Sequence, residues 1–197
     1  MSDNFEILDF PEIYEKYQSK ILRYLYRLTG EREESRDLTQ EVFIKVNNNL
    51  LKFEGKSSLS TWIYKIATNV ANDRFRSASF QKYKKQQLSG EFIEENKEDK
   101  NVWTGNKEMS VEDQVARKEM SECINRYIYD LNENYRTVIV LSEFEELKNQ
   151  EIADILGISI DTVKIRIHRG RTQLKKRMDK GCNITPDPDS GLFCDEK

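Results

Sequence analysis

Apolar residues recur every three or four positions along most of the chain, which is the spacing of amphipathic helices. The first such stretch begins at Pro11, where a missing N–H costs nothing in a first helical turn, and ends at Gly30. The second stretch carries apolar residues at Leu38, Val42, Val46 and Leu50. Because strand-like alternation is scarce throughout, the pattern predicts an all-α protein.

The third helix is preceded by a polar stretch, residues 53–60, which we interpret as a loop around Gly55. Ser60 or Thr61 can cap the helix that follows. The positions of that helix predicted to face inward are Ile63, Ile66, Ala67, Val70 and Ala71. Trp62 lies at the start of this apolar face, so we interpret it as a core residue rather than a platform for a stacked base.

The composition changes sharply over residues 91–113, where eight acidic residues accompany three basic ones and few hydrophobic ones. Such a segment cannot bury enough apolar surface to fold. Helical periodicity returns in two further stretches, residues 110–131 and 133–144. We therefore predict two small helical domains, residues 8–86 and 111–178, joined by a disordered acidic linker at 87–110 and followed by a flexible tail at 179–197.

Residues 149–177 have the plan of a helix-turn-helix motif. The first helix of the motif has an apolar face formed by Ile152, Ala153, Ile155 and Leu156. Gly157 follows at a position where a left-handed residue can end the helix, and Ser159 can cap the next one. The apolar side of the second helix consists of Ile160, Val163 and Ile167.

This second helix is strongly basic. From Lys164 to Lys180 there are eight Lys or Arg residues and one Asp, a local excess of seven positive charges. Such a charge density suits a helix that binds duplex DNA. The alternative is a solvated basic helix on an ordinary bundle, and the agreement between turn signals and charge favours DNA binding.

Residues 131–178 resemble region 4 of the extracytoplasmic-function (group 4) sigma factors of the sigma-70 family. The resemblance rests on Leu131, Tyr135, Arg136, residues 151–157, Thr162, Val163, Lys164, Arg166, His168 and Arg169. The chain departs from that family pattern at Asn132, Ile165 and Gly170. Because Gly inside a helix costs about 1 kcal/mol relative to Ala, we expect the helix to loosen after Arg169.

An earlier part of the chain resembles region 2 of the same family. The matching residues are Asp37, Leu38, Gln40, Glu41, Val42, Phe43, Phe53, Gly55, Ser58, Thr61, Trp62, Ile63, Tyr64, Ile66, Ala67, Asn69, Asp73 and Arg74. A polar stripe on one face of the predicted second helix consists of Asp37, Gln40, Glu41 and Ile44. Taken alone, such a stripe is usually solvated surface, but the resemblance implies that it binds the largest subunit of core RNA polymerase.

The resemblance also implies two sets of DNA contacts. Contacts to the duplex upstream promoter element would come from Asp161, Thr162, Lys164, Ile165, Arg166, His168, Arg169 and Arg171. Contacts to the downstream element, read as a single strand, would come from Lys56, Ser57, Ser58, Leu59, Lys65, Asn69, Asn72 and Arg76. Basic and aromatic residues also alternate over residues 74–85, which suits a single-strand junction or a frayed helix end equally.

We therefore expect an RNA polymerase sigma factor of the extracytoplasmic-function type, which directs core polymerase to specific promoters and assists strand opening. The expected partners are core RNA polymerase and promoter DNA, with an anti-sigma factor as a further candidate. The alternative is a stand-alone helix-turn-helix transcriptional regulator. Such a regulator needs a dimer with fixed half-site spacing, and the sequence contains no evident dimerisation helix.

Composition narrows the remaining function classes. The 197 residues carry a net charge of −3 and include one His, His168, so we predict no enzyme, no metal site and no cofactor. No apolar run is long enough to cross a membrane and the acidic N-terminus is no signal peptide, so the expected location is the cytoplasm. Cys123, Cys182 and Cys194 lack zinc-ligand spacing. We predict that Cys182 and Cys194 are dispensable for folding, the alternative being a redox-active pair across the tail.

Overall fold

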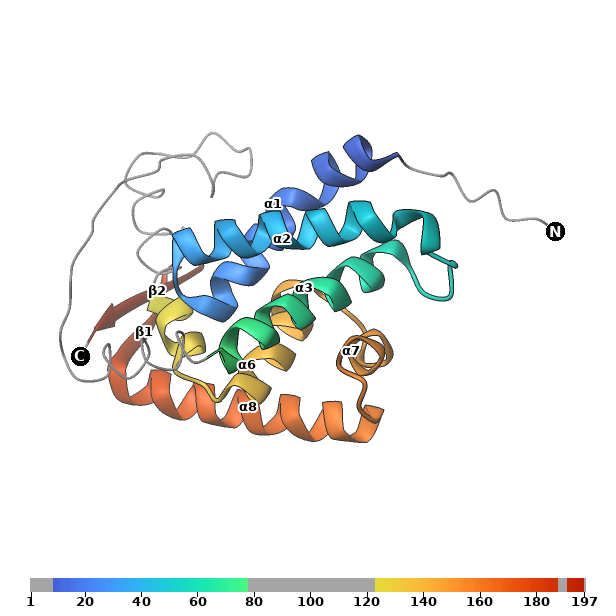
Figure 1. Cartoon of the computed structure of the whole chain (residues 1–197). Helices are drawn as coiled ribbons and strands as arrows, with labels where there is room; N and C mark the ends of the chain where they lie inside the picture. Colours follow the sequence, from blue (N-terminus) through green and yellow to red (C-terminus); the bar gives the residue numbers. More distant parts are fainter. Residues whose placement is uncertain (1–8, 78–122, 188–190, 197) are drawn as a thin grey trace.

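The computed structural model describes residues 9–77, 123–187 and 191–196. Figure 1 shows the helices of the N-terminal half lying above those of the C-terminal half. The N-terminal half consists of α1 (Phe10–Thr29), α2 (Arg32–Asn49), the short 3-10 turn η1 (Leu50–Lys52) and α3 (Leu59–Arg76). The C-terminal half consists of a helical segment at residues 123–129, α6 (Glu133–Ile139), the π-helical turn η2 (Val140–Phe144), α7 (Asn149–Leu156) and α8 (Ile160–Gly181).

Helix α1 is bounded by capping residues at both ends. The Asp9 carboxylate accepts the backbone N–H of Glu12 at 3.1 Å, and the Glu12 carboxylate accepts that of Asp9 at 3.2 Å. This reciprocal capping box places Pro11 in the first turn. Gly30 ends the helix in the left-handed region, with φ 76°. The predicted first helix is confirmed.

One contiguous hydrophobic core joins the two halves, with buried side chains from α1, α2 and α3 and from α6, η2, α7 and α8. Helix α3 packs against α7, and α1 packs against η2 and α6. Within the N-terminal half, the hydroxyls of Tyr24 and Thr68 lie 2.7 Å apart in the core. The helical halves confirm the all-α prediction, and their packing adds a direct contact between them.

The start of α3 differs from the sequence prediction. The N-cap is Ser58, whose side chain accepts the backbone N–H of Thr61 at 3.0 Å, and not Ser60 or Thr61. The hydroxyls of Ser58 and Thr61 lie 2.8 Å apart, so Thr61 belongs to the first turn. Leu59, predicted in the loop, is therefore the first helical residue.

Helix α8 does not loosen after Arg169, so that expectation is wrong. Gly170 is buried inside an unbroken helix, where α8 crosses α6. A Cβ added at Gly170 would lie only 2.8 Å from Cγ1 of Ile139. The glycine is therefore required by close packing between helices, and that packing holds the helix together.

The predicted flexible tail at 179–197 is also corrected. Helix α8 continues to Gly181, and β1 (Cys182–Asp187) then pairs antiparallel with β2 (Gly191–Glu196). β-branched and aromatic residues such as Ile184 and Phe193 favour extended backbone, a signal that a search for helical periodicity overlooks. The predicted linker at 87–110, the helical stretch before residue 123 and the basic–aromatic residues after 77 lie outside the described residues.

Candidate nucleic-acid and protein interfaces

The corner between α7 and α8 has the geometry of a helix-turn-helix motif. Gly157 ends α7 with φ 64°, and the N–H of Ile158 donates to the carbonyl of Ala153 at 3.2 Å. The Ser159 side chain then caps α8 by accepting the N–H of Thr162 at 3.2 Å. These contacts confirm the predicted turn and fix the direction in which α8 leaves it.

The residues predicted to contact upstream DNA divide between an exposed face and a flank of α8. The exposed face consists of Asp161, Lys164, Ile165, His168 and Arg169, with Thr162 half-buried at its edge. Ile165 is 52% exposed, so its side chain is accessible from this face. Arg166 instead lies half-buried on the flank that faces α6.

Two of the α8 cations predicted to contact upstream DNA form ion pairs. The Lys164 ammonium lies 3.7 Å from the Asp161 carboxylate. The Arg171 guanidinium lies 2.7 Å from a carboxylate oxygen of Glu143, in η2. Exposed pairs such as these contribute only about 0–1 kcal/mol, so a phosphate can displace either carboxylate at small cost.

The residues predicted to read the downstream element lie on α3 and on the loop before it. Lys65, Asn69 and Arg76 are exposed on one face of α3, and Asn72 is half-buried on the same face. In the loop, Gly55 adopts a positive φ of 68°, and the exposed Lys56 forms an ion pair with Glu54. Ser58 is occupied as the cap of α3, so its hydroxyl holds the end of the loop.

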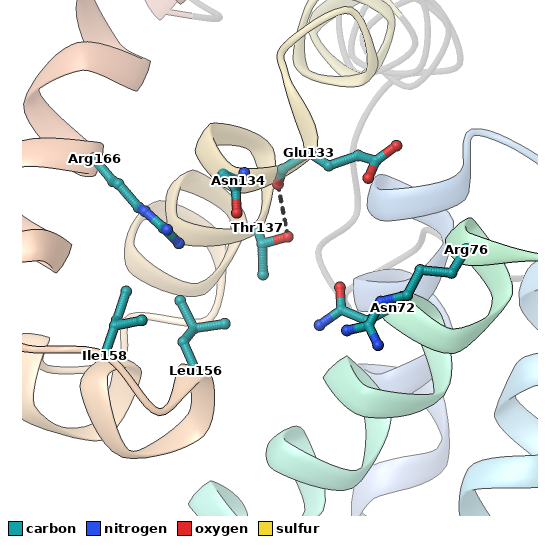
Figure 2. A pocket seen from close by; sticks show the side chains of 8 residues that line it. All are labelled: Asn72, Arg76, Glu133, Asn134, Thr137, Leu156, Ile158 and Arg166. Carbon is teal, nitrogen blue, oxygen red and sulfur yellow. Dashed lines mark hydrogen bonds between the residues drawn. The ribbon is translucent and has the colours of Figure 1, made fainter.

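The two predicted DNA-contacting sets meet at a cavity of about 300 Å³ between the halves (Figure 2). Asn72 and Arg76 line one side of this cavity, and Arg166 lines the other. The remaining lining residues are Glu133, Asn134, Thr137, Leu156 and Ile158. The packing of the halves thus places part of the α3 face opposite the helix-turn-helix.

The polar stripe of Asp37, Gln40, Glu41 and Ile44, hereafter the α2 stripe, is exposed along its length. Ile44 is 61% exposed, while Val42 and Val46 on the opposite side of the helix are fully buried. Glu41 forms an ion pair with Lys45 one turn later, at 3.1 Å. The stripe is therefore a free acidic and apolar surface, which suits a protein partner better than the phosphates of DNA.

Glu145 lies at the contact between the halves, a feature that sequence reasoning missed. Its carboxylate accepts a short hydrogen bond from the Tyr64 hydroxyl and lies 3.7 Å from the Arg27 guanidinium. Burial raises the pKa of Glu145, although the Tyr64 hydrogen bond and Arg27 oppose the shift. Because 81 residues separate Tyr64 from Glu145, no local sequence pattern could have paired them.

Arg136 forms a second connection between the halves. Its buried guanidinium donates to the carbonyls of Leu28 and Tyr129, and to that of Leu131 at 3.1 Å. It also stacks on the Tyr129 ring, 4.4 Å from the centroid. Burial lowers the pKa of Arg136. The family resemblance includes this arginine, but its contact with the end of α1 is visible only in the fold.

Metal-binding clusters and membrane-spanning helices are both absent from the described parts of the chain. No three His, Cys, Asp or Glu side chains there gather closely enough to hold a metal ion. No helix there is long and apolar enough to span a membrane.

Both halves of the chain match known protein families, the N-terminal half matching region 2 and the C-terminal half matching region 4 of one family. The family described as Sigma-70 region 2 matches residues 13–81, and Sigma-70, region 4 matches residues 121–174. The sigma factor SigW of Bacillus subtilis (strain 168) is 37% identical over 171 residues, covering 86% of this chain and 88% of SigW. YlaC of the same organism, also a sigma factor, is 34% identical over 169 residues, covering 86% and 91%.

Solved structures show the same fold. The sigma factor RpoE from Bartonella quintana, in complex with the anti-sigma factor NepR, superposes with a TM-score of 0.63 at 20% identity. That alignment covers 87% of this chain and 97% of RpoE. CnrH, in complex with the cytosolic domain of CnrY, gives a TM-score of 0.57 at 20% identity, covering 86% and 87%.

Proposed function

The chain belongs to the extracytoplasmic-function group of the sigma-70 family. On that premise we propose which of its exposed surfaces binds core polymerase and which bind promoter DNA. The observation that carries the function is the match of region 2 to α1–α3 and of region 4 to the C-terminal half. The protein is an RNA polymerase sigma factor that acts in transcription initiation. It works without chemistry of its own, in the cytoplasm, by binding core polymerase and promoter DNA.

The α2 stripe is the proposed contact with core polymerase. Asp37 and Glu41 would repel phosphates, so a protein surface carrying cations fits them better than DNA. Ile44, which follows Glu41 on the stripe and is 61% exposed, supplies an apolar contact of the kind that protein interfaces bury. A bidentate ion pair between Arg74 and Glu34, at 2.5 and 2.9 Å, anchors α2 to α3 beside the stripe.

The exposed face of α8 is the proposed reader of the duplex upstream element. Lys164 and Arg169 can bind phosphates or the edge of a guanine, and Ile165 can contact a thymine methyl group. Ser159 and Thr162 hold the start of the helix, so the side chains nearest the bases project from a fixed turn. Arg166 is half-buried beside the cavity, so it can contact DNA together with this face only if the cavity opens.

The loop before α3, with the exposed face of that helix, is the proposed reader of the single-stranded downstream element. Lys56 offers a phosphate contact, Ser57 a hydroxyl for base edges, and Gly55 close approach of the backbone. Asn72 and Arg76 face the helix-turn-helix across the cavity, whereas the two promoter elements lie apart on DNA. We therefore propose that the halves separate when both elements are bound, with residues 87–110 as the linker.

Holoenzyme assembly tests the proposal. The full chain is mixed with core RNA polymerase, complex formation is followed by size-exclusion chromatography, and transcription is measured on a promoter with a pre-opened fork. We expect Asp37→Lys and Glu41→Lys to weaken assembly, while Glu15→Lys, the same charge change at an exposed position of α1, leaves it intact. Full assembly by both stripe variants would disprove the assignment of the stripe.

The same experiment separates the proposed function from that of a stand-alone regulator. The stand-alone regulator is not favoured, because such a protein has no need of region 2, and it predicts binding to duplex DNA without any complex with core polymerase. An anti-sigma factor remains a proposed partner, since RpoE, of similar fold, is bound to one.

A further inference from the structure

The end of α8 brings together two cysteines that are distant in the sequence. The sulfur atoms of Cys123 and Cys182 lie 3.6 Å apart, although 59 residues separate them. Both are thiols in this structure, and their residues are 8% and 3% exposed. Cys123 lies on the helical segment at 123–129, and Cys182 follows the last residue of α8.

The surrounding backbone holds the sulfurs in this position. The N–H of Cys182 donates to the carbonyl of Met178, so the last turn of α8 fixes it. The Tyr127 hydroxyl lies 3.4 Å from the Cys182 sulfur. A Cβ added at Gly181 would overlap that hydroxyl, so glycine at this position leaves room for the Tyr127 side chain. The thiol pair is therefore part of a packed corner and does not depend on movement of the tail.

Cys194, the third cysteine, is poorly placed to form a disulfide with Cys182. In the β1–β2 register, Cys182 lies opposite Glu196 and Ile184 lies opposite Cys194. Cys182 and Cys194 are thus diagonal neighbours, which in antiparallel pairs lie about 7–8 Å apart. A disulfide normally needs Cα atoms about 4.4–6.8 Å apart, so this pair would have to move its backbone.

We propose that Cys123 and Cys182 are a redox-sensitive modification site that closes to a disulfide on exposure to a hydroperoxide. One sulfur takes the terminal oxygen of the peroxide and becomes a sulfenic acid, releasing the corresponding alcohol, or water from hydrogen peroxide. The second sulfur then attacks the sulfenic sulfur, so the S–S bond forms, the S–O bond breaks and the hydroxyl leaves as water with the proton of the attacking thiol. The two thiols lose two electrons in total and the peroxide gains them.

The burial of the two sulfurs determines which class of oxidant reaches them, and the length of the closed loop determines the effect on stability. Sulfurs on residues only 8% and 3% exposed admit a small hydroperoxide more readily than a bulky disulfide such as oxidised glutathione. The closed bond would join residues 123 and 182 and so enclose α6, α7 and all of α8 in one loop. Such a loop restricts the unfolded chain most when it is long, so oxidation stabilises the DNA-binding half.

Peptide mapping of the full chain tests the site. The reduced protein is treated with hydrogen peroxide, alkylated, digested without reductant and analysed by mass spectrometry. We expect one crosslinked peptide containing Cys123 and Cys182, lighter by two hydrogens and separated again by dithiothreitol. The variant Cys194→Ser should keep this crosslink, whereas Cys123→Ser should lose it.

A second measurement does not depend on whether buried variants fold. Wild-type protein should unfold at a higher temperature after oxidation than after reduction, by several degrees, and Cys194→Ser should show the same difference. Absence of the Cys123–Cys182 peptide after peroxide treatment of the folded protein overturns the proposal. A predominant Cys182–Cys194 crosslink, or one between two molecules, overturns it as well. None of these results depends on polymerase or DNA binding.

Discussion

Two glycines of the helix-turn-helix half serve different physical purposes. Gly157 adopts a positive φ of 64°, and no atom lies within 4 Å of the Cβ it lacks, so it is required by backbone conformation. Gly170 has ordinary helical backbone and is required by the contact with Ile139. The sequence predicted the first, because a turn glycine has a local signature. It mispredicted the second, because a contact between α8 and α6 leaves no local trace.

Replacing Gly170 with Ala separates helix propensity from packing. Propensity alone would favour Ala by about 1 kcal/mol, whereas forcing extra atoms into a packed site costs about 1–3 kcal/mol. We expect Gly170→Ala to lower the free energy of unfolding, measured by urea denaturation. In a double-mutant cycle with Ile139→Ala, which removes the opposing Cγ1 atom, the same change should become neutral or favourable. A stabilised single variant would contradict the packing account.

At the scale of elements, the sequence predicted which helices exist better than where they begin. Apolar periodicity identified α1, α2, α3, α7 and α8, and the Gly30, Gly157 and Ser159 caps were recognised from residue type. The start of α3 was displaced because Ser58, Ser60 and Thr61 are all plausible caps by residue type. The hydrogen bond from the Thr61 N–H to the Ser58 hydroxyl, at 3.0 Å, shows where the loop turns into the helix.

Two serine substitutions test the N-cap of α3. Loss of a side-chain cap costs about 1 kcal/mol, so Ser58→Ala should lower the free energy of unfolding by about that amount. Ser60→Ala is the matched control and should have a much smaller effect, because Ser60 lies within the first turn. Both values come from thermal or urea unfolding of the full chain. A larger loss of unfolding free energy for Ser60→Ala than for Ser58→Ala would instead support Ser60 as the N-cap, as the sequence predicted.

At the scale of the whole molecule, the arrangement of the halves could not be predicted from the sequence. Tyr64–Glu145 and Arg136–Leu28 pair residues that lie 81 and 108 positions apart. Thr61 likewise reaches Glu151 across the contact, at 3.2 Å. The candidate surfaces were predicted more fully than the arrangement of the halves, because the polar side of an amphipathic helix is its exposed side. What the sequence missed is that Arg166 and Asn72 line one cavity.

The buried carboxyl of Glu145 predicts a pH-dependent stability. Burial raises the folded-state pKa of Glu145 above its unfolded value, so its contribution is full below the unfolded pKa, about 4.3, and is lost as pH rises through the folded pKa. Gln cannot ionise. We therefore expect the stability of Glu145→Gln relative to wild type to increase from about pH 4.3 towards neutrality.

The measurement is the free energy of unfolding of both proteins across that pH range. Arg23, Arg27 and Lys20 of α1 and Tyr64 of α3 surround the carboxyl and are unchanged in the variant. Glu15→Gln, exposed on α1, controls for the loss of one surface carboxylate. A difference between Glu145→Gln and wild type that stays constant or falls with rising pH would refute the assignment.

The central claim is that α8 and the loop before α3 read different promoter elements within one sigma factor. The most direct measurement is transcription by reconstituted holoenzyme from a library in which both elements are randomised. We predict that Arg169→Ala changes only the upstream preference, costing about 1–3 kcal/mol if the arginine contacts a guanine. Exchange of residues 53–59 for the loop of a relative should change only the downstream preference. Unaltered preferences at both elements, or equal shifts at both in each variant, would contradict the claim.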